Sequence, residues 1–120
     1  MATSSQTPTV LPLSEALSPQ RKSYMAALSL AETIMSEALA LPSSFDVNVH
    51  PWTPNSPELR FYFHHDVPGL RQFRDDQMLT ESMTEREDGS VYIEAVRDDV
   101  NGVRVVAWTL SDAKSSAVAA

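Results

Sequence analysis

The 120-residue chain contains no cysteine. Without thiols, neither a disulfide framework nor a thiolate-bound metal site can form, so packing alone must stabilise the fold. This absence fits a reducing cytoplasm, which is the location we expect. No stretch approaches the roughly 18 apolar residues of a membrane span, and the first ten residues lack a basic start followed by an apolar run. We therefore expect neither secretion nor contact with a membrane.

Glycine is also scarce, with only Gly69, Gly89 and Gly102, all at predicted turns or caps. Loops that cradle phosphate groups need several glycines at close spacing, and a serine nucleophile elbow needs Gly-x-Ser-x-Gly. Neither pattern occurs, and the missing cysteine excludes a thiol nucleophile. The sequence therefore argues against nucleotide-dependent enzymes and the common hydrolases, and we expect no cofactor, no bound metal and no dedicated catalysis.

Positive charge is the third scarcity, since nine Lys and Arg face sixteen Asp and Glu, for a net charge of −7. Affinity for DNA or RNA comes chiefly from Lys and Arg that neutralise phosphates, so direct nucleic-acid binding is not expected. Nine acids lie between Asp75 and Asp99, against Arg86 and Arg97. We interpret this segment as a solvated face, and the alternative is an acidic surface for a basic partner.

Local composition divides the chain into three parts. Residues 1–17 are rich in Ser, Thr, Pro and Ala without sustained periodicity, which predicts an irregular N-terminal tail. Residues 113–120 are small and polar to neutral, which predicts a C-terminal tail. Residues 18–112 contain the periodic segments, and a length near 100 residues suits a single domain with one core.

A helix is predicted from Ser18 and Pro19 to about Ala40. Serine caps the free N–H groups of a first turn, and proline at the first helical position loses nothing by lacking its own N–H. Leu41-Pro42 ends the segment. Apolar residues recur along it at helical spacing, which predicts one broad buried face: Tyr24, Ala27, Leu28, Leu30, Ala31, Ile34, Met35 and Ala38.

The rest of the domain alternates between period-two segments and one short helix. Strands are predicted over residues 45–49, 59–63, 91–97 and 103–110, a weak edge strand over 79–87, and a helix from the N-cap Asp66 to Met78. The order α-β-β-α-β-β-β predicts an α+β fold with an antiparallel sheet of four to five strands and helices packed on one face.

The register of the last hairpin stays open. A two-residue loop at Asn101-Gly102 places Asp99 opposite Arg104, whereas a five-residue loop that begins at Asp98 places Tyr92 opposite Trp108. The second alternative gathers six residues on one face: Val91, Ile93, Ala95, Val103, Val105 and Ala107.

The best constellation for chemistry is His64-His65-Asp66 at a strand end, with His50 as the remaining histidine. Two imidazoles and a carboxylate suit zinc binding or proton transfer. Adjacent residues on a strand point to opposite faces, however, so the imidazoles are not expected to converge on one ion. Asp66 also has a structural role as helix cap.

Aromatic residues are the strongest candidates for a contact surface. With Phe61 and Phe63 facing inward, Tyr62 points outward, and Trp52, Tyr92 and Trp108 are expected to join it on or near the uncovered sheet face. Tyrosine and tryptophan are enriched at protein interfaces. The alternatives are that Trp108 is a core residue and that Trp52 only packs the proline-rich turn.

Three functional hypotheses follow. The favoured one is a non-enzymatic intracellular binding or regulatory module that contacts a protein partner, or a second copy of itself, through a sheet face or edge. The second is a small metal-binding or acid–base enzyme centred on His64, His65 and Asp66. The third is a phage-type acidic decoy that occupies a nucleic-acid-binding protein.

Overall fold

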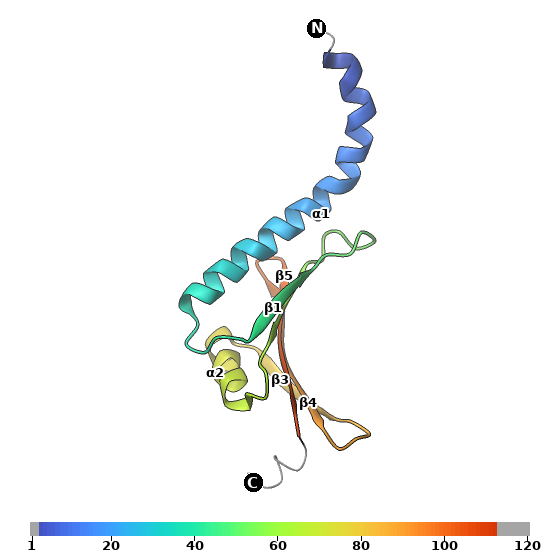
Figure 1. Ribbon diagram of the computed structural model, residues 1–120. Coiled ribbons are helices and arrows are strands. Elements are labelled where there is room, and N and C mark those ends of the chain that lie inside the picture. Colours follow the sequence, from blue (N-terminus) through green and yellow to red (C-terminus); the bar gives the residue numbers. More distant parts are fainter. Residues whose placement is uncertain (1–2, 113–120) are drawn as a thin grey trace.

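The computed structural model describes residues 3–112, with side chains from Ser18 onward (Figure 1). Within residues 3–112 the chain forms two helices and a sheet of five strands. These elements are α1 (Thr3–Glu37), β1 (Ser44–Asn48), β2 (Glu58–Tyr62), α2 (Val67–Gln77), β3 (Thr80–Glu85), β4 (Val91–Val100) and β5 (Val103–Ser111). The predicted α+β class and the predicted order of elements are confirmed. The C-terminal tail predicted for residues 113–120 lies outside the described residues.

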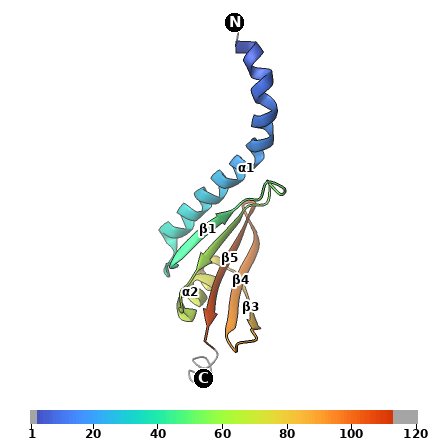
Figure 2. The same ribbon diagram turned by 45° about the vertical axis from the view of Figure 1, so that its right-hand side comes forward.

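The sheet is mostly antiparallel, but β2 and β5 run parallel to each other. The strand order is β1-β2-β5-β4-β3, so the last of the described strands lies in the middle of the sheet (Figure 2). The sequence predicts antiparallel pairs throughout. Parallel neighbours need a long crossover between them, and α2 together with β3 and β4 forms that crossover here. Because β2 and β5 are far apart in the sequence, no short sequence pattern indicates that they pair.

Both helices lie on one side of the sheet, as predicted (Figure 1). α1 packs over β1, β2 and β5, while α2 packs against β5. The core between the layers is aromatic at its centre, where the ring of Phe73 lies 5.0 Å from Phe61 and 5.3 Å from Phe63 between centroids. Ala27, Ala31 and Ile34 of α1 close the same core. The face of the sheet away from α1 and α2 is called the open face below.

The start of α2 follows the predicted capping chemistry. Asp66 Oδ1 accepts a hydrogen bond from the Gly69 backbone N–H at 2.9 Å, and Pro68 lies in the first turn. A Cβ at position 69 would lie 2.1 Å from Asp66 Oδ2, so glycine is needed for the close approach. The helix ends at Met78, whose left-handed backbone (φ 58°) donates to Arg74 and Asp75 carbonyl groups.

α1 begins at Thr3 rather than at Ser18, so the backbone differs from the irregular segment predicted for residues 1–17. The prediction rested on the abundance of Ser, Thr, Pro and Ala in residues 1–17 and on the lack of sustained periodicity there. Extending an existing helix adds one hydrogen bond per residue without a new nucleation step, which favours growth from a stable helix. The axis changes direction within the blue part of the ribbon (Figure 1).

The turn between β4 and β5 is the two-residue loop Asn101-Gly102. Asn101 (φ 53°) and Gly102 (φ 86°) both have positive φ, as a type I′ hairpin turn requires. Val100 pairs with Val103 across this turn. The first of the two alternative registers is therefore correct at the turn itself.

Beyond the turn, a bulge between Arg97 and Val100 changes the register. Ala95 then pairs with Ala107 and Glu94 with Trp108, a pairing that neither alternative contains. Because of the bulge, Val91, Ile93 and Ala95 of β4 lie on the helix side together with Val103, Val105 and Ala107 of β5. These are the six residues that the five-residue loop alternative places on one face, although their cross-strand partners differ from those of that alternative. An extra residue in one strand has this effect because side chains alternate with period two.

Candidate interaction surface

Three of the four predicted contact aromatics lie together on the open face. Tyr62 pairs with Trp108 across the parallel strands β2 and β5, and their ring centroids are 4.4 Å apart. Tyr92 of β4 lies diagonally across from Trp108, at 5.9 Å between centroids. Tyr62, Trp108 and Tyr92 are called the aromatic strip below. The strip crosses the middle three strands of the sheet.

Arg60 holds the strip together electrostatically. Its guanidinium carbon lies 5.8 Å from the Trp108 ring centroid, within reach of a cation–π interaction. The same guanidinium donates to the Tyr92 hydroxyl at 3.2 Å and lies 3.8 Å from a Glu58 carboxylate oxygen. The side chains therefore fix one another through both ring contacts and hydrogen bonds.

The Tyr92 hydroxyl continues this network by donating to Glu94 Oε2 at 2.8 Å. Partial burial raises the pKa of Tyr92, the neighbouring Glu94 carboxylate raises it further, and Arg60 opposes both. Tyr92 therefore remains a neutral hydrogen-bond donor at neutral pH. Because the Tyr92 hydroxyl is hydrogen-bonded to both Arg60 and Glu94, these three polar groups hold fixed positions on the open face.

Val106 shows how closely these side chains pack. It lies on the open face, between Arg60 and Val96 in the register, and yet it is 0 % exposed. Trp108, Tyr62 and Tyr92 are each partly buried. Since α1 and α2 lie on the other side of the sheet, neighbouring side chains must cover Val106. Trp108 is therefore partly buried, as expected for the alternative in which it is a core residue, and it also lies on the open face.

Trp52 lies apart from the strip, in the loop between β1 and β2. It is 76 % exposed, and its ring stacks on His50 at 4.7 Å with an interplanar angle of 12°. α1 anchors the same loop, because Gln20 Nε2 donates to the Val49 carbonyl at 3.0 Å and the Ser23 hydroxyl donates to the Pro54 carbonyl. The structure therefore places Trp52 on an anchored loop and not on the sheet face.

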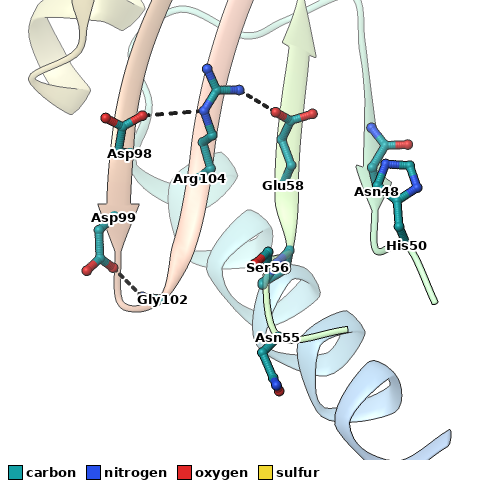
Figure 3. Close-up of a pocket in the computed structure, with 10 residues that line it drawn as sticks. Asn48, His50, Asn55, Ser56, Glu58, Asp98, Asp99, Gly102 and Arg104 are labelled. Atoms are coloured by element: carbon teal, nitrogen blue, oxygen red, sulfur yellow. Dashed lines mark hydrogen bonds and ion pairs between the residues drawn. The ribbon is translucent and has the colours of Figure 1, made fainter. Parts of the chain in front are cut away.

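A depression of about 460 Å³ adjoins this loop at the end of the sheet (Figure 3). Its polar lining includes Asn48, His50, Asn55, Glu58, Asp98 and Arg104.

Arg104 is the cation at the centre of that lining. It donates to Glu58 on one side and to Asp98 Oδ1 at 3.4 Å on the other (Figure 3). Burial lowers the pKa of Arg104, but the hydrogen bond to Glu58 and the surrounding carboxylates outweigh it, so the pKa is raised. The depression is therefore walled by ion pairs made within the protein.

The two adjacent imidazoles lie closer together than strand geometry predicts. The ring centroids of His64 and His65 are 4.2 Å apart, because β2 ends at Tyr62 and His65 has a left-handed backbone (φ 50°). His64 Nδ1 lies 2.7 Å from the Tyr62 hydroxyl, so this histidine borders the aromatic strip. The two rings therefore contact each other, unlike adjacent side chains of a regular strand, which point to opposite faces.

These histidines do not form a metal site with the rest of the described chain. His50 follows the end of β1 that pairs with Glu58, whereas His64 follows the opposite end of β2. Asp66 is engaged as the cap of α2. Among the residues that the structure describes, no group of three or more His, Asp or Glu is arranged to hold a metal ion.

The acids between Asp75 and Asp99 are spread over several elements. Glu81 lies between Arg71 and Arg74 of α2, with N–O distances of 3.1 and 2.6 Å. Asp75 is paired with Arg74 at 2.8 Å. Part of the acidic charge is therefore neutralised locally, which weakens the interpretation of this segment as one continuous acidic face.

The sequence did not identify Arg60, Glu58 and Glu94 as members of the surface. A signal was present, because Glu58, Arg60 and Tyr62 alternate along β2 and Tyr92 and Glu94 alternate along β4. Without the parallel pairing of β2 and β5, however, nothing placed Arg60 beside Trp108. The contacts depend on a pairing that has no local signature.

The fold and the surface together define a two-layer α+β protein with an aromatic strip on its open sheet face. No family model, curated protein or solved structure matches the chain. In the described part of the chain, no helix is both long enough and apolar enough to cross a membrane.

Proposed function

We propose that the protein is a non-enzymatic intracellular module that binds a protein partner, or a second copy of itself, through its sheet. The aromatic strip on the open face is the contact surface, and a regulatory or adaptor role follows from binding without chemistry. Hypotheses that need a convergent metal site or one acidic face receive less support from the geometry described above.

The observation that carries the proposal is the set of contacts around Trp108. Tyr62 lies against one side of it at 4.4 Å, Tyr92 lies at 5.9 Å, and Arg60 stands over the ring. Aromatic residues and arginine dominate the energetics of protein interfaces because they bury large areas and lose little conformational freedom. Their mutual contacts hold them in place before binding, which lowers the entropy lost on association.

The test compares variants of the open face with variants of the histidine cluster. The tagged full-length chain and each variant are expressed in the native cells, and the proteins that co-purify with the wild type are identified. Affinity for the purified partner is then measured by calorimetry. Tyr62→Ala should weaken binding by at least about tenfold, because an aromatic anchor at an interface commonly contributes 2 kcal/mol or more.

The matched control is the combined variant His65→Ala, Asp66→Asn, which preserves capping at position 66 because asparagine is also a good N-cap. It should bind within about twofold of the wild type, since exposed polar residues at an interface rim contribute little. Tyr62→Phe separates the ring from its hydrogen bond to His64. All variants must remain folded at the assay temperature. Normal binding by folded Tyr62→Ala, with loss of binding in the control, would overturn the proposal.

A further inference from the structure

The two edges of the sheet differ in how they meet solvent. β1 and β3 are the edge strands, and within residues 3–112 no strand pairs with the outer side of either. An outer edge presents unpaired backbone N–H and C=O groups to any strand that approaches it. Folded proteins usually protect such edges with charges, prolines or bulges, so an unprotected edge is informative.

The β3 edge is protected by charge. Glu81 lies on the helix side of β3, where Arg71 and Arg74 of α2 hold both carboxylate oxygens. Glu85 adds a second carboxylate at the end of the strand. A strand that approached this edge would have to accommodate these charges, so β3 resists pairing with another chain.

The β1 edge lacks comparable protection. On its helix side lie Phe45, which is 43 % exposed although its ring contacts Phe61, and the partly buried Val47. Asp46 is the sole charged residue of β1, and it lies on the open-face side opposite Arg60. β1 therefore presents an apolar row and a free backbone edge together.

The helix beside this edge also exposes apolar side chains. α1 runs along the β1 side of the helix layer (Figures 1 and 2). Its exposed residues include Tyr24, Met25 and Leu28, and Leu41 is exposed in the connection that leads to β1. A lone pair of five-residue strands would bury too little for a stable interface, which needs about 1,200 Å² in total. The apolar residues of α1 are suited to supply the additional area.

We propose that β1 pairs antiparallel with β1 of a second copy, so that two sheets join into one continuous sheet. The inference rests on the proposed function, and it specifies that the partner at the β1 edge is a second copy of the protein. Antiparallel pairing centred on Val47 places Val47 opposite its own copy and Asp46 opposite Asn48 of the second copy. An amide then faces a carboxylate and no like charges face each other, which makes the edge self-complementary.

The first experiment measures the mass of the untagged full chain by sedimentation equilibrium over a range of concentrations. The expected result is a reversible dimer of twice 13.2 kDa. Phe45→Glu should raise the dissociation constant at least about tenfold, because a carboxylate buried in the contact lacks a partner. Met83→Glu is the matched control, since Met83 is exposed on the helix side of the other edge strand. It should leave the dissociation constant unchanged.

Because Phe45 also contacts the core, a second measurement uses the wild-type chain alone. Backbone hydrogen exchange is compared at concentrations well above and well below the dissociation constant. The amides of β1 should exchange more slowly in the dimer, whereas those of β3 should not change. A dimer with unchanged β1 exchange would overturn the inference, and so would a chain that stays monomeric at about 100 µM or above.

These outcomes are distinct from those of the proposed function. A monomer that loses its partner on Tyr62→Ala overturns the edge pairing and leaves the contact role of the aromatic strip standing. A β1-paired dimer with no other partner sensitive to Tyr62→Ala supports the edge pairing and removes the role of the strip.

Discussion

The two faces of the sheet are buried by different means. On the helix face, Leu59, Phe61 and Ala95 are completely buried because α1 and α2 form a second layer above them. On the open face, Val106 is equally buried, although its cover comes from neighbouring side chains of the same sheet. The helix face thus depends on the docking of two layers, whereas the open face depends on strand register. This difference predicts how each face responds to substitution.

The largest effect is expected at the centre of the helix face. Phe61→Ala removes a completely buried ring that contacts both Phe45 and Phe73, and it should lower the free energy of unfolding by about 3–5 kcal/mol. Urea denaturation measures the change. Phe45→Ala, at the exposed border of the same cluster, should lower the free energy of unfolding clearly less. Equal losses in the two variants would show that Phe61 is not the centre of the aromatic cluster.

A smaller loss is expected on the open face. Val106→Ala removes two completely buried methyl groups and should lower the free energy of unfolding by about 2 kcal/mol. Val96→Ala, its cross-strand neighbour, is the matched control. Val96 is only partly buried, so about 1 kcal/mol is expected. If both variants lose the same stability in urea titrations, the side chains of the open face do not cover Val106 as described.

A gain in stability is expected from a substitution at the polar residue Thr109, which is buried on the otherwise apolar helix face. Thr109 is completely buried, and its hydroxyl has no hydrogen-bond partner, alone among the buried side-chain polar atoms of the described residues. Thr109→Val removes an unsatisfied group at nearly constant shape and should raise the free energy of unfolding by about 1 kcal/mol. Thr84→Val, at an exposed position of β3, serves as the control. A loss of stability in Thr109→Val would mean that the hydroxyl is satisfied in solution.

The smallest effect concerns the charged border of the helix face. The hydrogen bond from Arg71 is the largest influence that holds the pKa of Glu81 below its ordinary value of 4.5, and Arg74 adds to it. Because the folded pKa is lowered, this stabilisation is complete above the unfolded pKa and is lost as the pH falls through the folded pKa. Glu81→Gln should therefore lower the free energy of unfolding by about 1 kcal/mol at pH 7.

The same variant should show a reduced pH dependence. Once the pH has fallen below the lowered folded pKa, the carboxyl is protonated in both states, and the difference between wild type and Glu81→Gln should disappear. Urea titrations at several pH values measure this convergence. A difference that persists unchanged at low pH would contradict an ionic role for Glu81.

Local chemistry made much of the fold predictable. Alternation along β2, the Asp66 cap and the Asn101-Gly102 turn each act over a few residues, so they are visible in the sequence. The parallel pairing of Tyr62 with Trp108 joins residues far apart in the chain, and no short-range pattern marks it. The three aromatics of the strip were predicted as contact residues, whereas Arg60 was not, because its place beside Trp108 follows from that pairing.

The central position of β5 bears on the order in which the protein folds during synthesis. β1 and β2 leave the ribosome early, but the strand that joins them to β3 and β4 is the last to emerge. Until then, the outer edge of β2 lacks its parallel neighbour, and α2 lacks the strand against which it packs. Stable folding must therefore wait until β5 has been released, and nascent chains that stop before Val103 should remain sensitive to proteases.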